Sequence, residues 1–282
     1  MSPRTKRILQ SCAWAMQRAL RPLGLQASRR VGKRRVRFEL ASDIGMQLLI
    51  TGKFESEAIA HCAKFIAPDG VVIDVGANIG LHAVQFATRA HRGLVLALEP
   101  ARRALPLLLH NLRDLPNAVP LSVGLADSSG VRTFFVADDS AYSGLKDTGR
   151  KRILAEERIV CYSGDDLFAP LLAGKRIDLV KIDVEGLETP ILKGMQRLLR
   201  MHQPVIFCEV FAGQASNPDP DETVSWCRSL GYEAFVLKHG RLEPAGAHDD
   251  NFYHYFFVPP QRVHLATLPT AARRDSELVA SR

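Results

Sequence analysis

Three charged side chains stand at alternate positions of an otherwise apolar run, LVKIDVEG (179–186): Lys181, Asp183 and Glu185. Alternate side chains of a β-strand point to the same face of a sheet, so these three should lie side by side. Charges ending a central strand are costly to bury without partners. Two interpretations follow. The lysine and Asp183 form an ion pair that serves stability alone, or a carboxylate accepts a proton from a bound molecule.

A second stretch, VVIDVGANIGLHAV (71–84), is typical of a strand, a glycine-rich bend and the start of a helix. Gly76 can adopt backbone angles closed to other residues, and Gly80 allows close packing of the helix. The spacing differs from the dinucleotide pattern G-x-G-x-x-G, because Asn78 replaces the second glycine. A pyrophosphate, which needs the backbone pressed against it, therefore fits poorly.

An acidic residue after the next strand adds evidence that this bend binds a ligand. Glu99 ends the next predicted strand, 19 positions after Gly80, where a carboxylate can accept both hydroxyls of a ribose. Asp74, at the end of its own strand, is placed to face a cation. The expected ligand therefore has a ribose and a positive charge but no phosphate. S-adenosylmethionine meets this description better than a nucleotide does. The alternative is a helix-capping Asp74 and a solvated Glu99.

The elements around these residues alternate between strands and helices. A short hairpin is expected from 36–40 and 47–50, with helices at 54–67, from about 79, at 101–114, about 187–201 and 221–230, and strands at 71–75, 94–100, 118–124, 131–136, 158–163, 176–184, 204–210, 232–238 and 251–259. This order predicts an α/β fold with a doubly wound, mostly parallel sheet. The last two strands have no helix between them and should form an antiparallel edge pair.

Charge is unevenly distributed along the 282 residues, whose net charge is +7. Residues 1–37 contain eleven Lys or Arg and no acid, whereas the remainder has 26 basic and 30 acidic residues. We therefore divide the chain into a basic arm (1–37), a main domain (38–260) and a disordered tail (261–282). Five scattered cysteines without a C-x-x-C pair indicate a reducing compartment, so we expect a cytoplasmic protein.

The arm has two interpretations. Its residues 5–21 have the periodicity of an amphipathic helix, and SRRVGKRRVR (28–37) is a cationic run. Either the helix covers the domain edge and the run is a solvated linker, or the arm makes a peripheral contact with an anionic membrane. Nucleic acid is a disfavoured partner, because Trp14 is the only aromatic residue among the arm's charges.

Several motifs together resemble a known family. VIDVGANIG, LALEP, LVKIDVEGLETPILKGM and PVIFCEV are similar to successive motifs of the FkbM family of S-adenosylmethionine-dependent methyltransferases, over about residues 50–210. The resemblance implies a class I methyltransferase (Rossmann-like) fold and O-methylation of sugars, glycolipids or natural products. One departure is YSGDDLF (162–168), where Gly164 replaces the leucine usual in the family.

The resemblance also implies roles for single residues. Asp74, Gly76, Asn78 and Gly80 should surround the methionine end of the cofactor, and Glu99 should accept the ribose. Asp127 falls where this class often contacts adenine, although its place in ADSSG equally suits a turn former.

Catalysis should depend on a carboxylate near the cofactor. Methyl transfer is an in-line displacement that needs alignment of the reacting atoms and a base for the hydroxyl proton. Asp183 is our first candidate for this base and Glu185 the second, with Glu209 orienting the acceptor or assisting.

Other polar segments have ordinary explanations. His82 is expected to pack or cap the cofactor helix, and the spacing in HDDNFYH (248–254) matches no ligand pattern, so no metal is predicted. The polar stretch 136–152 is either a substrate lid or a solvated loop. As a lid, it would offer Tyr142 to a sugar ring, and Lys146, Arg150 and Arg152 to an anionic acceptor.

The sequence thus favours an O-methyltransferase whose acceptor is a hydroxyl of a sugar, glycolipid or secondary metabolite. Two alternatives remain: an RNA methyltransferase recruited by the basic arm, and a non-catalytic cofactor-binding interaction module.

Overall fold

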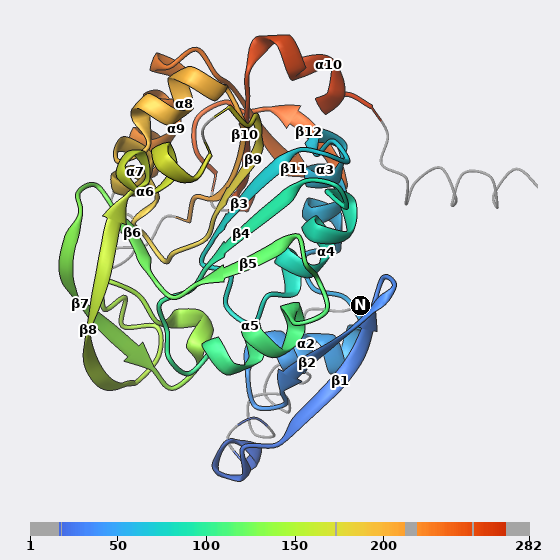
Figure 1. The fold of residues 1–282 in the computed structure, drawn as a ribbon, viewed down its shortest axis with the longest axis vertical. Helices are drawn as coiled ribbons and strands as arrows, with labels where there is room; N and C mark the ends of the chain where they lie inside the picture. The colour runs from blue at the N-terminus through green and yellow to red at the C-terminus, as the bar shows by residue number, and fades with distance from the viewer. Residues whose placement is uncertain (1–16, 18, 173, 212–218, 250, 269–282) are drawn as a thin grey trace, which may run out of the picture.

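A computed structural model describes residues 17, 19–172, 174–211, 219–249 and 251–268. Its central feature is an eight-stranded sheet in the order β12-β11-β13-β10-β9-β3-β4-β5 (Figure 1). The strands are β3 (Val71–Val75), β4 (Leu94–Leu98), β5 (Ala118–Leu121), β9 (Ile177–Ile182), β10 (Val205–Glu209), β11 (Glu233–Lys238), β12 (Arg241–Pro244) and β13 (His254–Val258). Strands β10, β9, β3, β4 and β5 are mutually parallel, which confirms the predicted doubly wound α/β class.

The antiparallel edge of the sheet is larger than expected. Strands β11 and β13 pair antiparallel, as predicted, and β13 also pairs antiparallel with β10. Strand β12 was not predicted, and it extends the edge by pairing with β11. Its sequence, RLEP, shows one buried residue, Leu242, and therefore too little alternation to be recognised as a strand.

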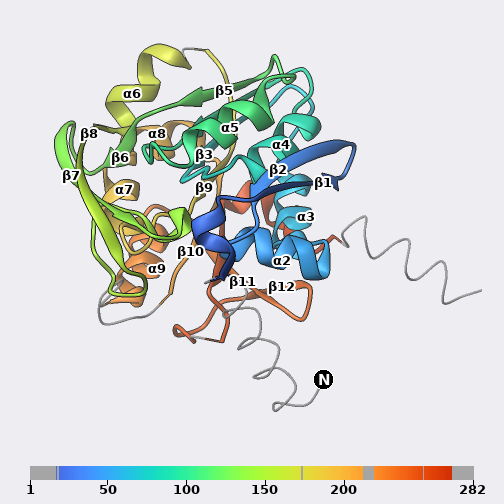
Figure 2. The same ribbon diagram turned by 90° about the horizontal axis from the view of Figure 1, so that it is seen from below.

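Helices cover both faces of this sheet. One face carries α3 (Ser56–Phe65), α4 (Leu81–Arg89) and α5 (Leu105–Leu112), and the other carries α6 (Gly164–Leu171), α7 (Glu188–Lys193), α8 (Gln196–His202) and α9 (Pro220–Ser229) (Figure 2). Within β3, Val72 joins the core on the first face, whereas Ile73 joins the core on the second. The strands are buried on both faces, as their continuous apolar sequences require.

A small second sheet lies beside the main one and has the order β6-β8-β7 (Figure 1). Its strands are β6 (Gly124–Ala126), β7 (Gly130–Ala137) and β8 (Ile153–Ser163). The single strand predicted at 118–124 is wrong, because the chain leaves the main sheet after Leu121 and pairs with β8 from Gly124. A side chain at Gly124 would place its Cβ 2.8 Å from Sγ of Cys161, so glycine permits this close pairing.

The cationic run of the arm is not a solvated linker. Residues 26–39 form an antiparallel hairpin of β1 (Gln26–Val31) and β2 (Arg34–Glu39). Val36 and Phe38 are buried in the core, while Arg35 and Arg37 between and beside them are exposed. Asn111 of α5 fixes the hairpin by accepting a hydrogen bond from Arg37 N and donating one to Arg37 O.

The predicted hairpin at 36–40 and 47–50 is accordingly wrong. Residues 47–50 belong to the helix α2 (Asp43–Thr51). Ser42 caps this helix by accepting a hydrogen bond from Gly45 N at 2.9 Å, and Ile44 and Leu48, one turn apart, are buried. The cap and the helical spacing outweigh the strand propensity of LLI.

The helix predicted at 187–201 is two helices, because the chain bends between α7 and α8. At the bend, a Cβ on Gly194 would lie 2.3 Å from Ala126 O, so the chain passes directly against β6. Asp165 caps α8 by accepting hydrogen bonds from Arg197 N and Leu198 N. Gly164 likewise allows close packing, because a Cβ added there would lie 2.2 Å from Met195 Cγ.

Three 3-10 turns, η1 (Arg21–Leu23), η2 (Ser140–Tyr142) and η3 (Pro260–Arg262), and the short α10 (Val263–Ala266) complete the described elements. The amphipathic helix expected at 5–21 lies almost entirely outside the described residues, as does the tail from 269 onward. The domain limits and the membrane contact stay predictions. No helix among the described residues is both long and apolar enough to span a membrane.

Candidate active site

A cavity of about 1160 Å³ opens where β3, β4, β9 and β10 end. Its wall includes Gly76 after β3, Glu99 after β4, Asp183 after β9, and Glu209 at the end of β10. The carboxyl ends of parallel strands meet at one edge of a sheet, which is where doubly wound folds bind ligands. The structure thus brings together most of the residues that the sequence singled out.

The glycine bend forms one wall. Gly76 has φ of 73°, and a Cβ there would lie 2.0 Å from Asp183 O, so no side chain fits. Asn78 also adopts left-handed angles, with φ of 48°. Gly80, in contrast, lies outside the cavity wall. Its Cβ would come within 2.8 Å of Leu108 Cδ1, so this glycine lets α4 approach α5.

Glu99 is held in place by the backbone. Oε2 accepts a hydrogen bond from Asn78 N at 2.8 Å, and Oε1 accepts one from Ala101 N at 2.7 Å. Burial raises the pKa of Glu99 to about 7, although both backbone donors act against the shift. Each carboxylate oxygen has a second lone pair, so the side chain retains acceptor capacity toward the cavity.

Asp74 does not reach the cavity. It is fully buried, and its Oδ1 lies 3.3 Å from Lys181 Nζ. The cation that Asp74 faces in this structure is Lys181. The two residues are directly paired across β3 and β9.

Lys181 connects several parts of the site. Its Nζ donates a hydrogen bond to Gly76 O at 2.9 Å and lies 3.2 Å from Asp183 Oδ2. Burial acts to lower the pKa of Lys181, but the carboxylates of Asp74 and Asp183 outweigh it and raise the pKa. The ion pair between Lys181 and Asp183 that the sequence suggested is therefore present. The same ammonium group also holds the glycine bend through its hydrogen bond to Gly76 O.

Each of the three candidate bases has a charged partner, which for Asp183 is Lys181. Glu185 accepts a hydrogen bond from Arg150 Nη1 at 2.6 Å, and burial raises its pKa to about 7. Glu209 Oε1 lies 2.9 Å from His254 Nε2. Asp183 is the most open of the three, with 32% of its side chain exposed, and burial raises its pKa despite the opposing charge of Lys181.

Next to Glu209 lies a group of residues that sequence reasoning did not bring together: it gave His82 and the segment 248–254 ordinary roles and did not consider Glu55. His254 Nε2 also lies 3.9 Å from Glu55 Oε1, and His82 Nε2 lies 3.3 Å from Glu55 Oε2. Burial lowers the pKa of His254, but the hydrogen bond to Glu209 and the negative charges of Glu209 and Glu55 outweigh it and raise the pKa to about 9. Burial lowers the pKa of His82 to about 3. Because these residues are far apart along the chain, no local motif could have indicated them.

Part of the segment 138–152 lines the cavity, namely residues 140–145, 150 and 151. Tyr142 donates a hydrogen bond to Asp43 Oδ2 at 2.6 Å, and Arg150 Cζ lies 4.6 Å from the Tyr142 ring. The Phe211 ring lies 5.6 Å from the same guanidinium. Of the cations expected to face the acceptor, Arg150 lines the cavity, whereas Lys146 and Arg152 do not.

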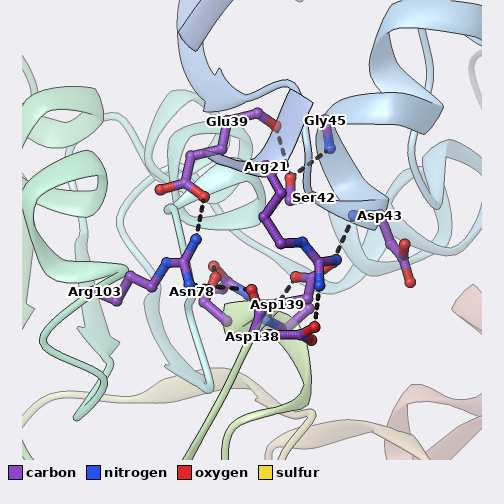
Figure 3. A network of polar contacts seen from close by, with 11 residues as sticks. Arg21, Glu39, Ser42, Asp43, Gly45, Asn78, Arg103, Asp138 and Asp139 are labelled. Carbon is purple, nitrogen blue, oxygen red and sulfur yellow. Dashed lines mark hydrogen bonds and ion pairs between the residues drawn. The ribbon is translucent and has the colours of Figure 1, made fainter. Parts of the chain in front are cut away.

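Polar contacts attach this segment to the N-terminal part of the chain (Figure 3). Arg21 pairs with Asp138, and Arg103 donates hydrogen bonds to Asp138 O and Glu39 Oε2. Two further contacts, Asp43 N to Asp139 Oδ2 at 2.8 Å and Ser140 Oγ to Asn78 Oδ1 at 3.3 Å, complete the attachment. The cavity wall is thereby tied to the glycine bend.

Asp127 lies outside the cavity. It is mostly exposed, and its Oδ1 accepts a hydrogen bond from Arg132 at 2.7 Å. The turn interpretation of ADSSG thus fits better than contact with adenine. Val123 and Leu125, near Asp127 in the chain, do line the cavity, and together with Leu98 they give it apolar surface.

The fold and this site define a class I methyltransferase: a doubly wound sheet, a glycine bend after one strand and an acid after the next. A model of the methyltransferase FkbM domain matches residues 74–234, and the chain belongs to this family. Its cofactor is S-adenosylmethionine. The residues fit this group, because the cavity offers a buried carboxylate at Glu99 and a bend without a side chain at Gly76.

Known relatives share the central part of the chain. The hexuronic acid methyltransferase AglP of Haloferax volcanii is 36% identical over 162 residues, which are 56% of this chain and 63% of AglP. The AMB antimetabolite synthetase AmbE of Pseudomonas aeruginosa is 27% identical over 229 residues, which are 67% of this chain and 11% of AmbE. The chain thus spans less than two thirds of either relative.

Comparison with solved structures also gives matches, of which one is a methyltransferase described as FkbM. The methyltransferase FkbM from Methylobacillus flagellatus is 15% identical, with a TM-score of 0.45, over 68% of this chain and 44% of that protein.

The role of Lys181 can be tested by Lys181→Met. This change should lower the free energy of unfolding by about 3–5 kcal/mol, because it leaves Asp74 as an uncompensated buried charge. Denaturant titration measures the loss. Asp183→Asn, which removes the half-buried partner, should cost much less, and adding Asp74→Asn to Lys181→Met should recover part of the loss. Equal stability of Lys181→Met and the wild type would contradict the assignment.

Proposed function

We propose that this methyltransferase methylates a hydroxyl group of a sugar or glycan, with S-adenosylmethionine as the donor. The observation that carries the proposal is the position of Asp183. Its main chain abuts the bend at Gly76, its carboxylate contacts Lys181, and its side chain opens into the cavity. A carboxylate there lies between the part of the cavity assigned to the cofactor and the part left for an acceptor.

The remaining part of the cavity suits a carbohydrate. Tyr142, Phe211 and Tyr253 line it with aromatic rings, and Glu185 and Glu209 add acceptors for hydroxyl groups. Arg150 and Lys151, also in the wall, provide positive charge for an acidic group on the acceptor. Similarity to a hexuronic acid methyltransferase supports this class of acceptor.

When bound, S-adenosylmethionine would supply a methyl group activated by its sulfonium charge, which would pass to the acceptor oxygen with the thioether as the leaving group. The protein aligns the acceptor and excludes water, which contributes about 7–11 kcal/mol in favourable cases. Asp183 accepts the hydroxyl proton. Its raised pKa makes it a stronger base than an ordinary aspartate.

A radiolabelled-methyl assay tests the acceptor class. The full chain is incubated with labelled S-adenosylmethionine and with glycan, lipid, small-molecule or RNA fractions, and the product is then treated with mild alkali. We expect labelled carbohydrate whose methyl group resists alkali, because an ether is stable and an ester is not. Alkali-labile label would show methylation of a carboxylate, and label confined to RNA would support the alternative acceptor.

Asp183→Asn tests the base. The substitution keeps the shape of the side chain and removes its basicity, so turnover should fall by about 10²–10⁴-fold. Cofactor affinity in calorimetry should stay within a few-fold of the wild type. The matched control is Glu185→Gln, which alters the carboxylate held by Arg150 and should reduce turnover less. Wild-type turnover in Asp183→Asn would exclude this residue as the base.

Glu99 makes cofactor binding depend on pH. Its carboxyl group, with a pKa of about 7, is protonated at lower pH and then loses acceptor capacity toward the ribose. Lowering the pH to one unit below this pKa leaves about a tenth of the groups ionised, so affinity should fall by up to about tenfold. Calorimetry between about pH 6 and pH 8.5 measures this. Glu99→Gln should bind more weakly at high pH and show a flatter profile; an unchanged profile would remove the ribose assignment.

A further inference from the structure

We propose that Glu55, Glu209 and His254 form a binding site for one divalent metal ion in the wall of the cavity. Each residue offers one ligand atom, and these atoms all lie within 4.8 Å of one another. Oxygen and imidazole nitrogen atoms at such mutual distances can share a single cation. Glu55 and Glu209 line the cavity, so an ion bound between them would be accessible from it.

The main chain holds these ligands in place. Glu209 ends β10 and His254 begins β13, and the two residues are direct partners in the antiparallel pairing of these strands. Glu55 precedes the first turn of α3 and has a left-handed φ of 46°, which is uncommon for a residue with a side chain. Strand pairing and a helix start thus converge on one point, as a site for a small ion requires.

His82 is the independent observation that points to a ligand. This residue is only 6% exposed, and its Nε2 is buried without a hydrogen-bond partner among the described residues. The atom is directed at the cluster, since it lies 3.3 Å from Glu55 Oε2. A buried ring nitrogen without a hydrogen bond is costly. His82 itself is outside the group of three ligands, so a water molecule bound to an ion beside Glu55 would donate the missing hydrogen bond to this nitrogen.

The ligand chemistry indicates the kind of ion. Imidazole nitrogen favours first-row transition metals, whereas carboxylate oxygen also suits manganese. We therefore infer a first-row divalent ion, for which Mn²⁺ is the most direct probe. An ion here would hold an acceptor hydroxyl and promote loss of its proton toward Asp183. This role rests on the proposed function, whereas binding of the ion does not.

Binding is tested with the full chain, freed of metal by a chelator and then dialysed. Mn²⁺ is added without cofactor or acceptor, and the six-line electron paramagnetic resonance signal of free Mn²⁺ is followed. We expect one equivalent to bind. Glu209→Gln and Glu55→Gln should each weaken binding by at least about tenfold, as expected for loss of a ligand. Unfolding midpoints establish that each variant is folded. If one variant fails to fold, the other still measures the loss of a ligand.

Glu185→Gln is the matched control. It removes another carboxylate from the same cavity but lies outside the cluster, so Mn²⁺ binding should stay within a few-fold of the wild type. The proposal is overturned if the wild type binds no Mn²⁺, or if the Glu209 and Glu55 variants bind it as the wild type does. In either of those cases, the role of His254 is limited to holding the carboxylates of Glu55 and Glu209 by its charge.

Activity distinguishes this inference from the proposed function. Methyl transfer that persists in protein without bound Mn²⁺ and without a response to added Mn²⁺ leaves the function intact and removes the catalytic role of the ion. Conversely, stoichiometric Mn²⁺ binding without transfer to carbohydrate supports the site and contradicts the proposed acceptor.

Discussion

The buried ammonium of Lys181 is the constraint on which the site depends. It contacts Asp74 on the neighbouring strand, the carbonyl of Gly76 in the bend and Asp183 at the end of its own strand. A cation that is only 2% exposed needs such partners to offset the loss of hydration. Because one side chain contacts all three, the glycine bend after β3 and the acid after β9 are fixed relative to each other.

Local patterns explain how much of this could be predicted from the sequence. The buried strands β3, β4, β9 and β10, the glycine bend and the acid after β4 depend on neighbours in the chain, and these were placed correctly. The failures arise where tertiary packing decides. The break between α7 and α8 follows from contact of Gly194 with β6, and the basic hairpin follows from burial of Val36 and Phe38. Likewise, Asp74 was directed toward a ligand because the register that pairs it with Lys181 cannot be read from either segment alone.

The two sides of the cavity are built differently. The side assigned to the cofactor is made of strand ends and backbone donors, so its geometry is set by the sheet itself. The side proposed for the acceptor draws on the segment 138–152, on α2 and on Tyr253, which precedes β13, so residues distant in sequence meet there. Burial of Glu99 and Glu185, each with a pKa of about 7, places carboxyl groups that titrate near neutrality on both sides.

The attachment of the segment 138–152 has a mechanical consequence. Arg21 and Asp138 are 117 positions apart in the chain and yet form an ion pair, and Asp43 contacts both Asp139 and Tyr142. The N-terminal part of the chain and the segment 138–152 are therefore held together at the cavity, where Gln17 and Asp43 of the former and Tyr142 of the latter form part of the wall.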